Sequence, residues 1–175
     1  MKKLKLATSN KNKLREVSEI LGYELESIDI DLEEIQAIDV IEVSKSKAIE
    51  GYKKMGFSVL VEDTSLSIDA WGGLPGALIK WFMQTVDNDG IIKMLGSEKN
   101  RGAVAKTVFA YADENGVHIF EGEIKGRITK EARGENGFGW DRIFIPLDSE
   151  ITFAEMSSGE KNKFSMRKLA LDKFL

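Results

Sequence analysis

The stretch Phe57-Ser58-Val59-Leu60-Val61-Glu62-Asp63-Thr64-Ser65 decides the fold, and the loop Gly72-Gly73-Leu74-Pro75-Gly76 follows it closely. Its apolar first half, 57–61, predicts a buried strand, and the glycine and proline loop leads into a helix that carries Lys80. Two adjacent carboxylates, Glu62 and Asp63, stand at the end of this strand. Carboxylates are costly to bury unless they hold a metal, a proton or a cation. The stretch is therefore a candidate centre of chemistry rather than of packing.

Strands and helices alternate on both sides of this stretch, and a hairpin follows. The spacing of apolar residues predicts strands over 4–8, 25–30, 57–61, 66–70, 104–112, 117–124 and 142–145. It predicts helices over 12–21, 40–55, 77–86, 89–95 and from Glu160 onward. The pair Asn115-Gly116 marks a tight turn between two long strands. We expect one α/β domain over residues 1–175, with a long mixed central β-sheet and flanking helices.

Composition excludes several classes of function. The formal net charge of −4 argues against a nucleic-acid polymer or a membrane surface as partner. The chain has no cysteine, which fits a cytoplasmic protein, and 1–6 is basic but lacks the apolar segment of a signal peptide. His118 is the only histidine, so a metal site must use oxygen ligands, which favours Mg²⁺, Mn²⁺ or Ca²⁺ over Zn²⁺.

The segment Thr8-Ser9-Asn10-Lys11-Asn12-Lys13 joins the first strand to the first helix. Backbone N–H groups at a helix N-terminus favour an anion, and Lys13 adds a positive charge. The segment is not a P-loop, because the glycines of that motif are missing. On this segment alone, an ordinary helix cap with solvated lysines is the better interpretation.

Three acidic residues, Glu34, Glu62 and Asp63, form a second candidate group. Magnesium is usually held by one or two carboxylates together with substrate phosphates. If the strand continues through Glu62 and Asp63, their side chains point to opposite faces, so at most one of them faces a given cleft. Glu34 lies in a loop from which it can reach the same cleft. The alternative is a solvated acidic edge, which suits Glu33 better than Asp63.

Three further segments have both a functional and a structural interpretation. In 72–76, followed by Lys80 and Trp81, glycines allow a close approach to a ligand, but such clusters usually form only a tight turn. In 137–141, Phe138 and Trp140 alternate with glycines and can stack on a planar base while Asp141 accepts hydrogen bonds; the alternative is aromatic core with a bulge.

The third segment, Glu160 to Lys168, is a basic helical run. Helical spacing places Lys161, Ser165 and Lys168 on one face and Lys163 with Arg167 on another. A solvated basic face is the usual meaning of such a run, although the planar guanidinium of Arg167 also suits a carbonyl or phosphate. Taken together, the five groups supply a carboxylate–metal centre, cations for phosphates and an aromatic slot. That combination suits a nucleoside triphosphate with magnesium.

In this order, the motifs resemble the inosine triphosphate pyrophosphatase family, which hydrolyses non-standard purine nucleoside triphosphates. The resemblance covers nearly the whole chain and rests on 8–13, 34–36, 61–64, 72–82, 138–141, 154–156, 160–162 and 165–167. It implies two lobes around a deep cleft, a homodimer, and magnesium-dependent cleavage of ITP, dITP and XTP to the monophosphate and pyrophosphate.

The resemblance also implies roles for individual residues. Asp63 is the expected general base and, with Glu34, a metal ligand; Thr64 lies beside the substrate. It implies that the phosphates are bound by the cations and polar groups Thr8, Ser9, Asn10, Lys11, Asn12, Lys13, Lys47 and Lys80. It implies that the nucleotide, and its base in particular, is bound by Phe138, Gly139, Trp140, Asp141, Lys161, Met166 and Arg167.

Met166 is a departure, because the family usually has histidine there. Methionine is only a weak acceptor and donates nothing, so one hydrogen bond to the purine six-position is lost or moved. Arg167 still donates and so matches a six-keto oxygen but not an amino group. Two alternatives stay open: a Maf-like pyrophosphatase acting on other modified nucleotides, and a purine nucleotide sensor without turnover.

Overall fold

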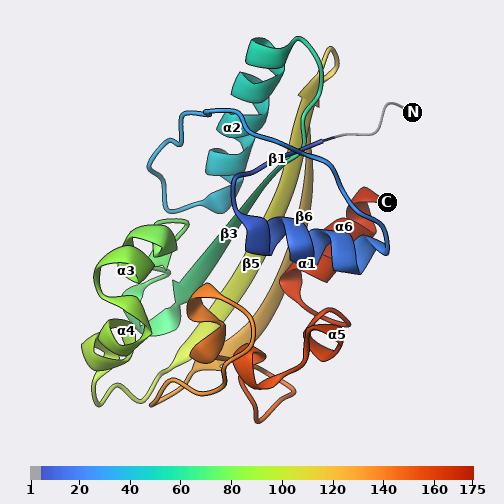
Figure 1. Cartoon of the computed structure of the whole chain (residues 1–175). Coiled ribbons are helices and arrows are strands. Elements are labelled where there is room, and N and C mark those ends of the chain that lie inside the picture. The colour runs from blue at the N-terminus through green and yellow to red at the C-terminus, as the bar shows by residue number, and fades with distance from the viewer. Residues whose placement is uncertain (1–4) are drawn as a thin grey trace.

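The computed structural model describes residues 5–175, and a five-stranded antiparallel sheet forms its centre (Figure 1). The strands follow one another in space in the order β4-β3-β5-β6-β7. Their bounds are β3 (Val61–Ile68), β4 (Pro75–Gly76), β5 (Gly102–Asp113), β6 (Gly116–Ile128) and β7 (Phe144–Pro146). The expected turn at Asn115-Gly116 joins β5 to β6, whose pairing runs from Asp113↔Gly116 to Gly102↔Arg127. This hairpin is the long axis of the molecule.

A parallel pair, β1 (Leu6–Ala7) and β2 (Ser27–Ile28), extends the structure at the N-terminus. The bridge between Leu6 and Leu60, also parallel, joins the pair to the chain that enters β3. The predicted α/β fold with mixed strands is therefore confirmed. Leu4, the first residue of the predicted opening strand, lies outside the described residues.

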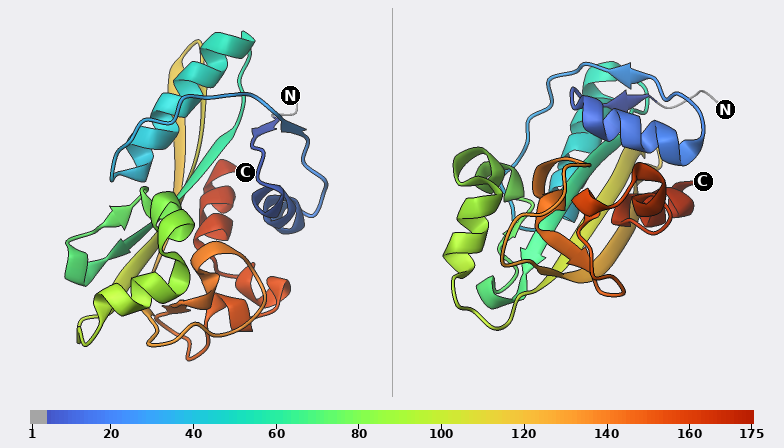
Figure 2. Two further views of the ribbon diagram at one scale, coloured as in Figure 1. Left: turned by 60° about the vertical axis from the view of Figure 1, so that its left-hand side comes forward. Right: turned by 60° about the horizontal axis from the view of Figure 1, so that its bottom comes forward.

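Helices cover both faces of the sheet (Figure 2). They are α1 (Lys11–Leu21), α2 (Val40–Met55), α3 (Ile79–Thr85), α4 (Asp87–Leu95), α5 (Ser158–Lys161) and α6 (Met166–Phe174), with short 3₁₀ turns at η1 (Asp69–Trp71), η2 (Gly139–Arg142) and η3 (Phe153–Glu155). Among residues 5–175, no helix has both the length and the apolar character needed to cross a membrane.

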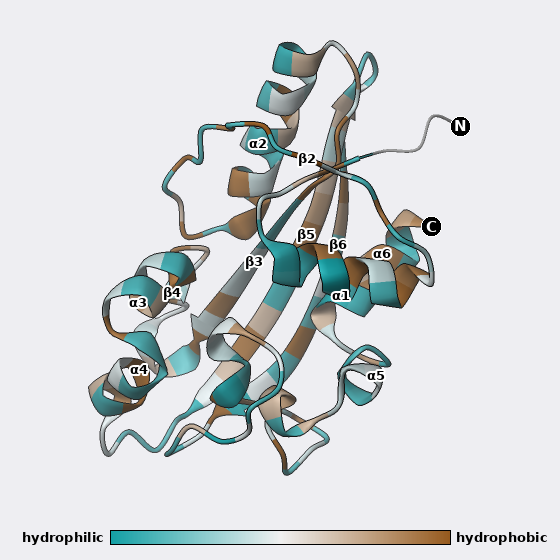
Figure 3. Cartoon of the chain, in the orientation of Figure 1, coloured by the Kyte–Doolittle hydropathy of each residue, from teal (hydrophilic) through white to brown (hydrophobic). Residues whose placement is uncertain are grey.

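Neighbouring residues of β5 show how the two faces are covered. Phe109 packs in a cluster with Val17 of α1 and Leu171 of α6, whereas Ala110 packs with Ala48 of α2. Figure 3 shows hydrophobic residues along the central strands, where these helices cover them. Side chains alternate between the two faces of a strand. Successive residues of β5 therefore pack first against α1 and α6 and then against α2.

Two predicted elements are wrong in a way that matters for the site. The strand predicted over 57–61 begins at Val61 instead, and Phe57 is 41% exposed. It then continues through both carboxylates to Ile68, so the separate strand predicted over 66–70 is its second half. The physical reason is the long-range pairing with β5, which is unbroken from Val61↔Ala110 to Ile68↔Ala103.

The helix predicted from Glu160 is also interrupted. It divides into α5 and α6, and the hydroxyl of Ser165 caps α6 by accepting from the N–H of Lys168. The helical face predicted for Lys161, Ser165 and Lys168 is therefore absent. A capping box starts α5, because the Ser157 and Glu160 side chains each accept from the other's backbone N–H.

Candidate active site

A cavity of about 670 Å³ gathers residues from four of the five candidate groups and from the start of α3. Eighteen of the candidate residues named above line it: Thr8, Ser9, Asn10, Lys13, Glu34, Lys47, Glu62, Asp63, Thr64, Lys80, Trp81, Phe138, Gly139, Trp140, Asp141, Lys161, Met166 and Arg167. Residues more than 150 positions apart in the sequence thus meet in one space. The cavity is the candidate active site.

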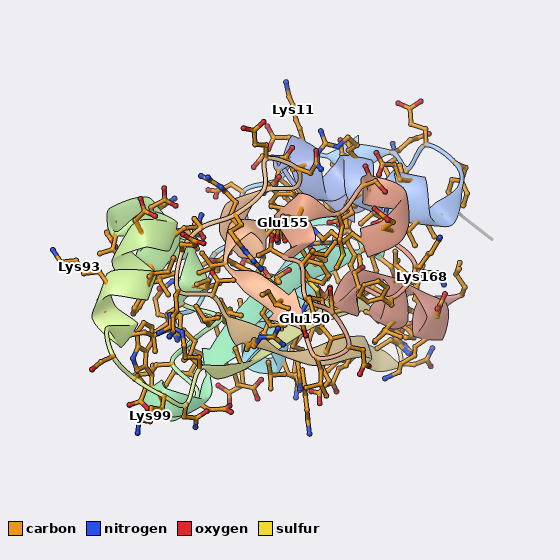
Figure 4. All side chains as sticks on the ribbon, turned by 90° about the horizontal axis from the view of Figure 1, so that it is seen from below. Lys11, Lys93, Lys99, Glu150, Glu155 and Lys168 are labelled. Carbon is orange, nitrogen blue, oxygen red and sulfur yellow. The ribbon has the colours of Figure 1, made fainter. Side chains whose placement is uncertain are left out.

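Three predicted ligand contacts do not reach this cavity. Lys11 is exposed and projects from the edge of the molecule in Figure 4, and Asn12 is used in the first turn of α1. The loop 72–76 also does not line it. Gly76 has φ of 59°, and a Cβ there would lie 2.4 Å from the carbonyl oxygen of Ile38, so the loop serves a tight packing contact. The interpretation of 72–76 as a tight turn is therefore correct.

Asp63 lies on the face of β3 that α2 covers. Its Oδ1 is 2.7 Å from the Nζ of Lys47, and its Oδ2 accepts a hydrogen bond of 3.1 Å from the hydroxyl of Ser44. Lys47 and Ser44 are three residues apart in α2, so one helical face supplies both donors. Asp63 is itself 8% exposed. A nearly buried carboxylate is thus held in a fixed direction at the cavity wall.

Glu34 reaches the same lysine from the loop before α2. Its Oε2 lies 3.1 Å from Lys47 Nζ, and its Oε1 lies 3.8 Å from Lys80 Nζ. Burial raises the pKa of Glu34, but the charge and hydrogen bond of Lys47, together with the charges of Lys80 and Lys13, outweigh it, and the net pKa is lowered. For Lys47, burial lowers the pKa, but the charges and hydrogen bonds of Asp63 and Glu34 together outweigh it, so the net pKa is raised. Glu34 and Lys47 therefore both stay charged at neutral pH.

The residues here fit a divalent metal that prefers oxygen ligands. The ammonium of Lys47 lies between the carboxylates of Glu34 and Asp63, which shows that a cation can be held by both at once. Within residues 5–175, no three acidic or histidine side chains converge as a ready metal cage. A metal bound by two carboxylates would complete its shell with water or substrate oxygens, as Mg²⁺ commonly does.

Glu62 lies on the opposite face of β3, toward α1 and α6. Its carboxylate is 3.0 Å from Arg167 Nη2, 2.9 Å from Lys13 Nζ and 2.8 Å from the Thr64 hydroxyl. Burial raises the pKa of Glu62, but Arg167 and Lys13 outweigh it and hold the pKa at about 2. Lys13 also donates to the Glu62 carbonyl oxygen over 3.1 Å. Lys13 is thus tied to the cavity floor, contrary to the interpretation as a solvated lysine.

The charges continue through the base of the cavity in alternating sign. Arg167 also pairs with Glu16, Glu16 lies 2.9 Å from Lys161, and Lys161 lies 2.7 Å from Asp141. Arg167 is 1% exposed, so the basic run after Glu160 is not a solvated face. A buried ion pair is stable only when each charge has partners, and here each charge contacts an opposite one.

Glu16 is the functional residue that the sequence analysis missed. It is 6% exposed and sits on the buried side of α1, four residues before Ile20 of the apolar stripe. A carboxylate within an apolar stripe is the signal that could have identified it, because such a group needs a buried cation. Its partners, Lys161 and Arg167, are more than 140 residues away, which hides the pairing from local patterns.

Phe138, which lines the cavity, lies against two of its cations. Lys161 Nζ lies 5.2 Å and the Arg167 guanidinium carbon 5.7 Å from the centre of its ring. Its backbone N–H donates to Asp141 Oδ2 over 2.9 Å, which fixes the loop. Burial raises the pKa of Asp141, with Lys161 opposing the shift. Gly139 is fixed as well, since its carbonyl accepts from the Asn88 side chain.

Trp140 and Met166 belong mainly to the core. Trp140 is 7% exposed and meets Phe144 edge to face with ring centres 5.6 Å apart. Met166 is 2% exposed and packs in the same cluster. Both still border the cavity. The interpretation of the aromatic segment as core therefore holds for Trp140, while Phe138 is available to a ligand.

Thr8 to Asn10 form the remaining edge of the cavity. The Asn10 side chain caps α1 by accepting from the N–H groups of Asn12 and Lys13, and the Thr8 hydroxyl accepts from the Asn10 N–H. The helix-cap interpretation of this segment is therefore correct. Lys13 takes part in this cap through its backbone N–H, while its side chain lines the cavity.

Comparison with known proteins shows which family the chain belongs to. Residues 4–175 match the model of the Ham1 family. The chain belongs to the Ham1 family. An inosine triphosphate pyrophosphatase of Kluyveromyces lactis is 45% identical over 91% of this chain and 87% of that protein. A dITP/XTP pyrophosphatase of Hyperthermus butylicus is 40% identical over 93% of this chain and 87% of its own.

Solved structures of Ham1 proteins share the fold. A HAM1 protein from Coxiella burnetii superposes with a TM-score of 0.83 at 29% identity, covering 99% of this chain and 96% of the other. A dITP/XTP pyrophosphatase from Mycobacterium abscessus gives a TM-score of 0.78 at 28% identity, with 98% of each chain covered. The resemblance found in the sequence motifs is confirmed by these matches.

Proposed function

We infer that this Ham1 protein hydrolyses non-standard purine nucleoside triphosphates, namely ITP, dITP and XTP, to the monophosphate and pyrophosphate. The observation that carries the inference is the pairing of Asp63 with Lys47 in the same cavity as Phe138 and Arg167. One end of the cavity suits a water-activating carboxylate and phosphates, and the other suits a planar base. Relatives covering most of the chain are named as ITP or dITP/XTP pyrophosphatases.

In the proposed mechanism, water attacks the α-phosphorus and Asp63 accepts its proton. Ser44 and Lys47 hold the two oxygens of Asp63, which sets the direction in which it can take a proton. A positioned general base is typically worth about 10²–10⁴-fold in rate. Lys13, Lys47 and Lys80 line the same cavity and can stabilise the charge that develops on departing pyrophosphate.

We propose Mg²⁺ as the cofactor, with Mn²⁺ as an alternative, held by Glu34 and Asp63. When bound, such an ion supplies positive charge that offsets the triphosphate and orients it. Lys47 already contacts both carboxylates and would give up part of this contact to the metal. Its ammonium would then be available to a phosphate oxygen.

Base recognition is assigned to Phe138 and Arg167. The Nη groups of Arg167 are engaged by Glu16 and Glu62, whereas its Nε has no hydrogen-bond partner among the described residues. A fixed guanidinium offers only donors, so it suits a six-keto oxygen and not the amino group of adenine. Met166, in place of the family's usual histidine, offers no donor beside it. We expect ATP to be a poor substrate and GTP to be less strongly rejected.

We propose in addition that the protein is a cytoplasmic homodimer, as the family resemblance implies. Light scattering coupled to gel filtration would measure the mass directly. A mass near 19.5 kDa, that of one chain, would contradict the dimer.

Asp63→Asn tests the mechanism. We expect the variant to fold and bind ITP but to lose about 10²-fold or more in pyrophosphate release with Mg²⁺. Asp148→Asn, a change at an exposed aspartate outside the cavity, is the matched control and should keep full activity. A folded Asp63→Asn variant with wild-type turnover would remove Asp63 from its role.

A substrate panel separates the alternatives. Pyrophosphate release across ITP, dITP, XTP, GTP and ATP, repeated with Met166→His, reports base preference. A Maf-like activity would instead favour modified pyrimidine nucleotides, and a sensor would bind without release. The names of the relatives favour neither alternative.

A further inference from the structure

A second pocket, of about 550 Å³, opens at the far end of the central hairpin. It is formed by 99–102 at the start of β5, 127–130 at the end of β6 and the segment up to Arg133. No residue of the described part of the chain lines both this pocket and the active-site cavity. Asp63 pairs with Val108, six residues along β5 from Gly102, so the two sites are roughly 20 Å apart along the strand.

The lining of this pocket is strongly basic. Of the eleven described residues that line it, five are lysine or arginine and one, Glu131, is acidic. The chain as a whole has a formal net charge of −4. A local concentration of cations on an acidic protein raises the local concentration of anions. The pocket therefore differs in sign from its surroundings.

Arg101 forms the fixed part of the pocket. It is 9% exposed, and its guanidinium donates to the carbonyl oxygens of Ile128, Thr129 and Gly96 over 2.9, 2.5 and 3.4 Å. No carboxylate of the described residues forms an ion pair with it. Carbonyl groups orient a guanidinium without neutralising it, and two of its five N–H donors remain. Burial lowers the pKa of Arg101, and the charge of Glu98 only partly opposes this shift.

The other cations of the pocket can exchange partners. Lys99 and Lys130 are exposed and make no ion pair or side-chain hydrogen bond within residues 5–175. Arg127 pairs with Glu150 over 2.9 Å, but the Glu150 side chain is 91% exposed, and Figure 4 shows Glu150 on the face seen from below. An exposed ion pair contributes little to stability, so a multivalent anion can replace Glu150 as the partner of Arg127.

Arg133 is held less completely. Its Nη2 donates to the Glu150 carbonyl over 3.1 Å and lies 3.4 Å from the Glu155 carboxylate. Its Nε is covered by protein and has no hydrogen-bond partner in the part of the chain that is described. An unsatisfied buried donor is uncommon in folded proteins.

The shape and chemistry of the lining select the class of ligand. Guanidinium groups bind phosphate oxygens in bidentate fashion. Among residues 5–175, no aromatic side chain lines the pocket, so the described lining offers no surface on which a base could stack. We propose that this pocket binds a small anion with two or more linked phosphate groups, through the phosphates alone and independently of the active site.

Titration of the full-length ¹⁵N-labelled protein with inorganic diphosphate tests this proposal. We expect amide signals of 99–102 and 127–133 to shift as one group, separately from those of the active-site cavity. In Lys99→Gln/Lys130→Gln, the affinity measured from the first group should fall about tenfold or more, because two charge-assisted contacts are lost. The affinity measured from the cavity should not change.

The control variant is Lys45→Gln/Lys93→Gln, which removes two exposed lysines that line neither pocket. It should keep both affinities, which separates a site from an effect of total charge. Orthophosphate should bind more weakly than diphosphate, and ATP should match tripolyphosphate, since the base is not recognised. Absence of shifts at 99–102 and 127–133, or equal shifts with sodium chloride at matched ionic strength, would overturn the proposal.

Discussion

Replacing Glu62 by glutamine should destabilise the protein by an amount that depends on pH in a defined way. Arg167 and Lys13 outweigh burial and hold the pKa of Glu62 at about 2, against an ordinary value of 4.5. Each unit of pKa corresponds to about 1.4 kcal/mol, so the charge stabilises the folded state by about 3 kcal/mol at neutral pH. Glutamine would also leave the buried Arg167 short of one counter-charge.

The sign follows from the lowered pKa. A carboxylate whose pKa is lower in the folded state contributes fully above its unfolded value and loses that contribution as pH falls toward the folded value. The difference between wild type and Glu62→Gln should therefore be about 3 kcal/mol at pH 7 and roughly half of that or less at pH 3. The comparison uses the difference in free energy of unfolding between the two proteins, because the titration of all other groups is common to both and cancels.

Urea denaturation at both pH values measures this difference. Glu123→Gln is the matched control, because Glu123 also pairs with a lysine, over 3.1 Å, but at an exposed position. It should cost no more than about 1 kcal/mol. A loss for Glu62→Gln as small as the control, or one that is equal at pH 7 and pH 3, would refute the assigned role of the Glu62 charge.

Two other substitutions test packing and base recognition. A Cβ at Gly122 would lie 2.0 Å from the Met166 carbonyl oxygen, so Gly122→Ala should cost about 1–3 kcal/mol in urea melts and slow ITP hydrolysis by displacing α6; Gly159→Ala, with open space around it, should do neither. Phe138→Ala should raise the KM for ITP roughly tenfold, as one stacking contact is worth about 1–3 kcal/mol. Steady-state kinetics of Phe138→Ala would measure this change. An unchanged KM would show that the base does not bind against Phe138.

Local signals predicted some elements very well. The helix expected over 40–55 has those bounds because Asp39 caps its start and Gly56, with φ of 70°, ends it. The hairpin turn at Asn115-Gly116 likewise depends on residues that are adjacent in sequence. Where residues adjacent in sequence determine the backbone conformation, the element could be predicted from the sequence.

Long-range contacts explain the failures. The length of β3 is set by eight residue pairs with β5, which begins more than thirty residues later. Arg167 looked like part of a solvated basic face because its partners, Glu16 and Glu62, are 151 and 105 positions away. The motifs brought most of the site residues together correctly, but only the fold showed which lysines and arginines are buried and paired.

The course of β3 through Glu62 and Asp63 sets a rule for changes in length. Side chains alternate along a strand, so inserting or deleting one residue ahead of this pair would exchange the two faces. The carboxylate meant for Arg167 would then point toward Lys47, and the one meant for Lys47 would point into the buried charges beside α6. A change of two residues would keep each on its own side. We therefore expect natural or engineered length variation at the start of β3 to come in even steps.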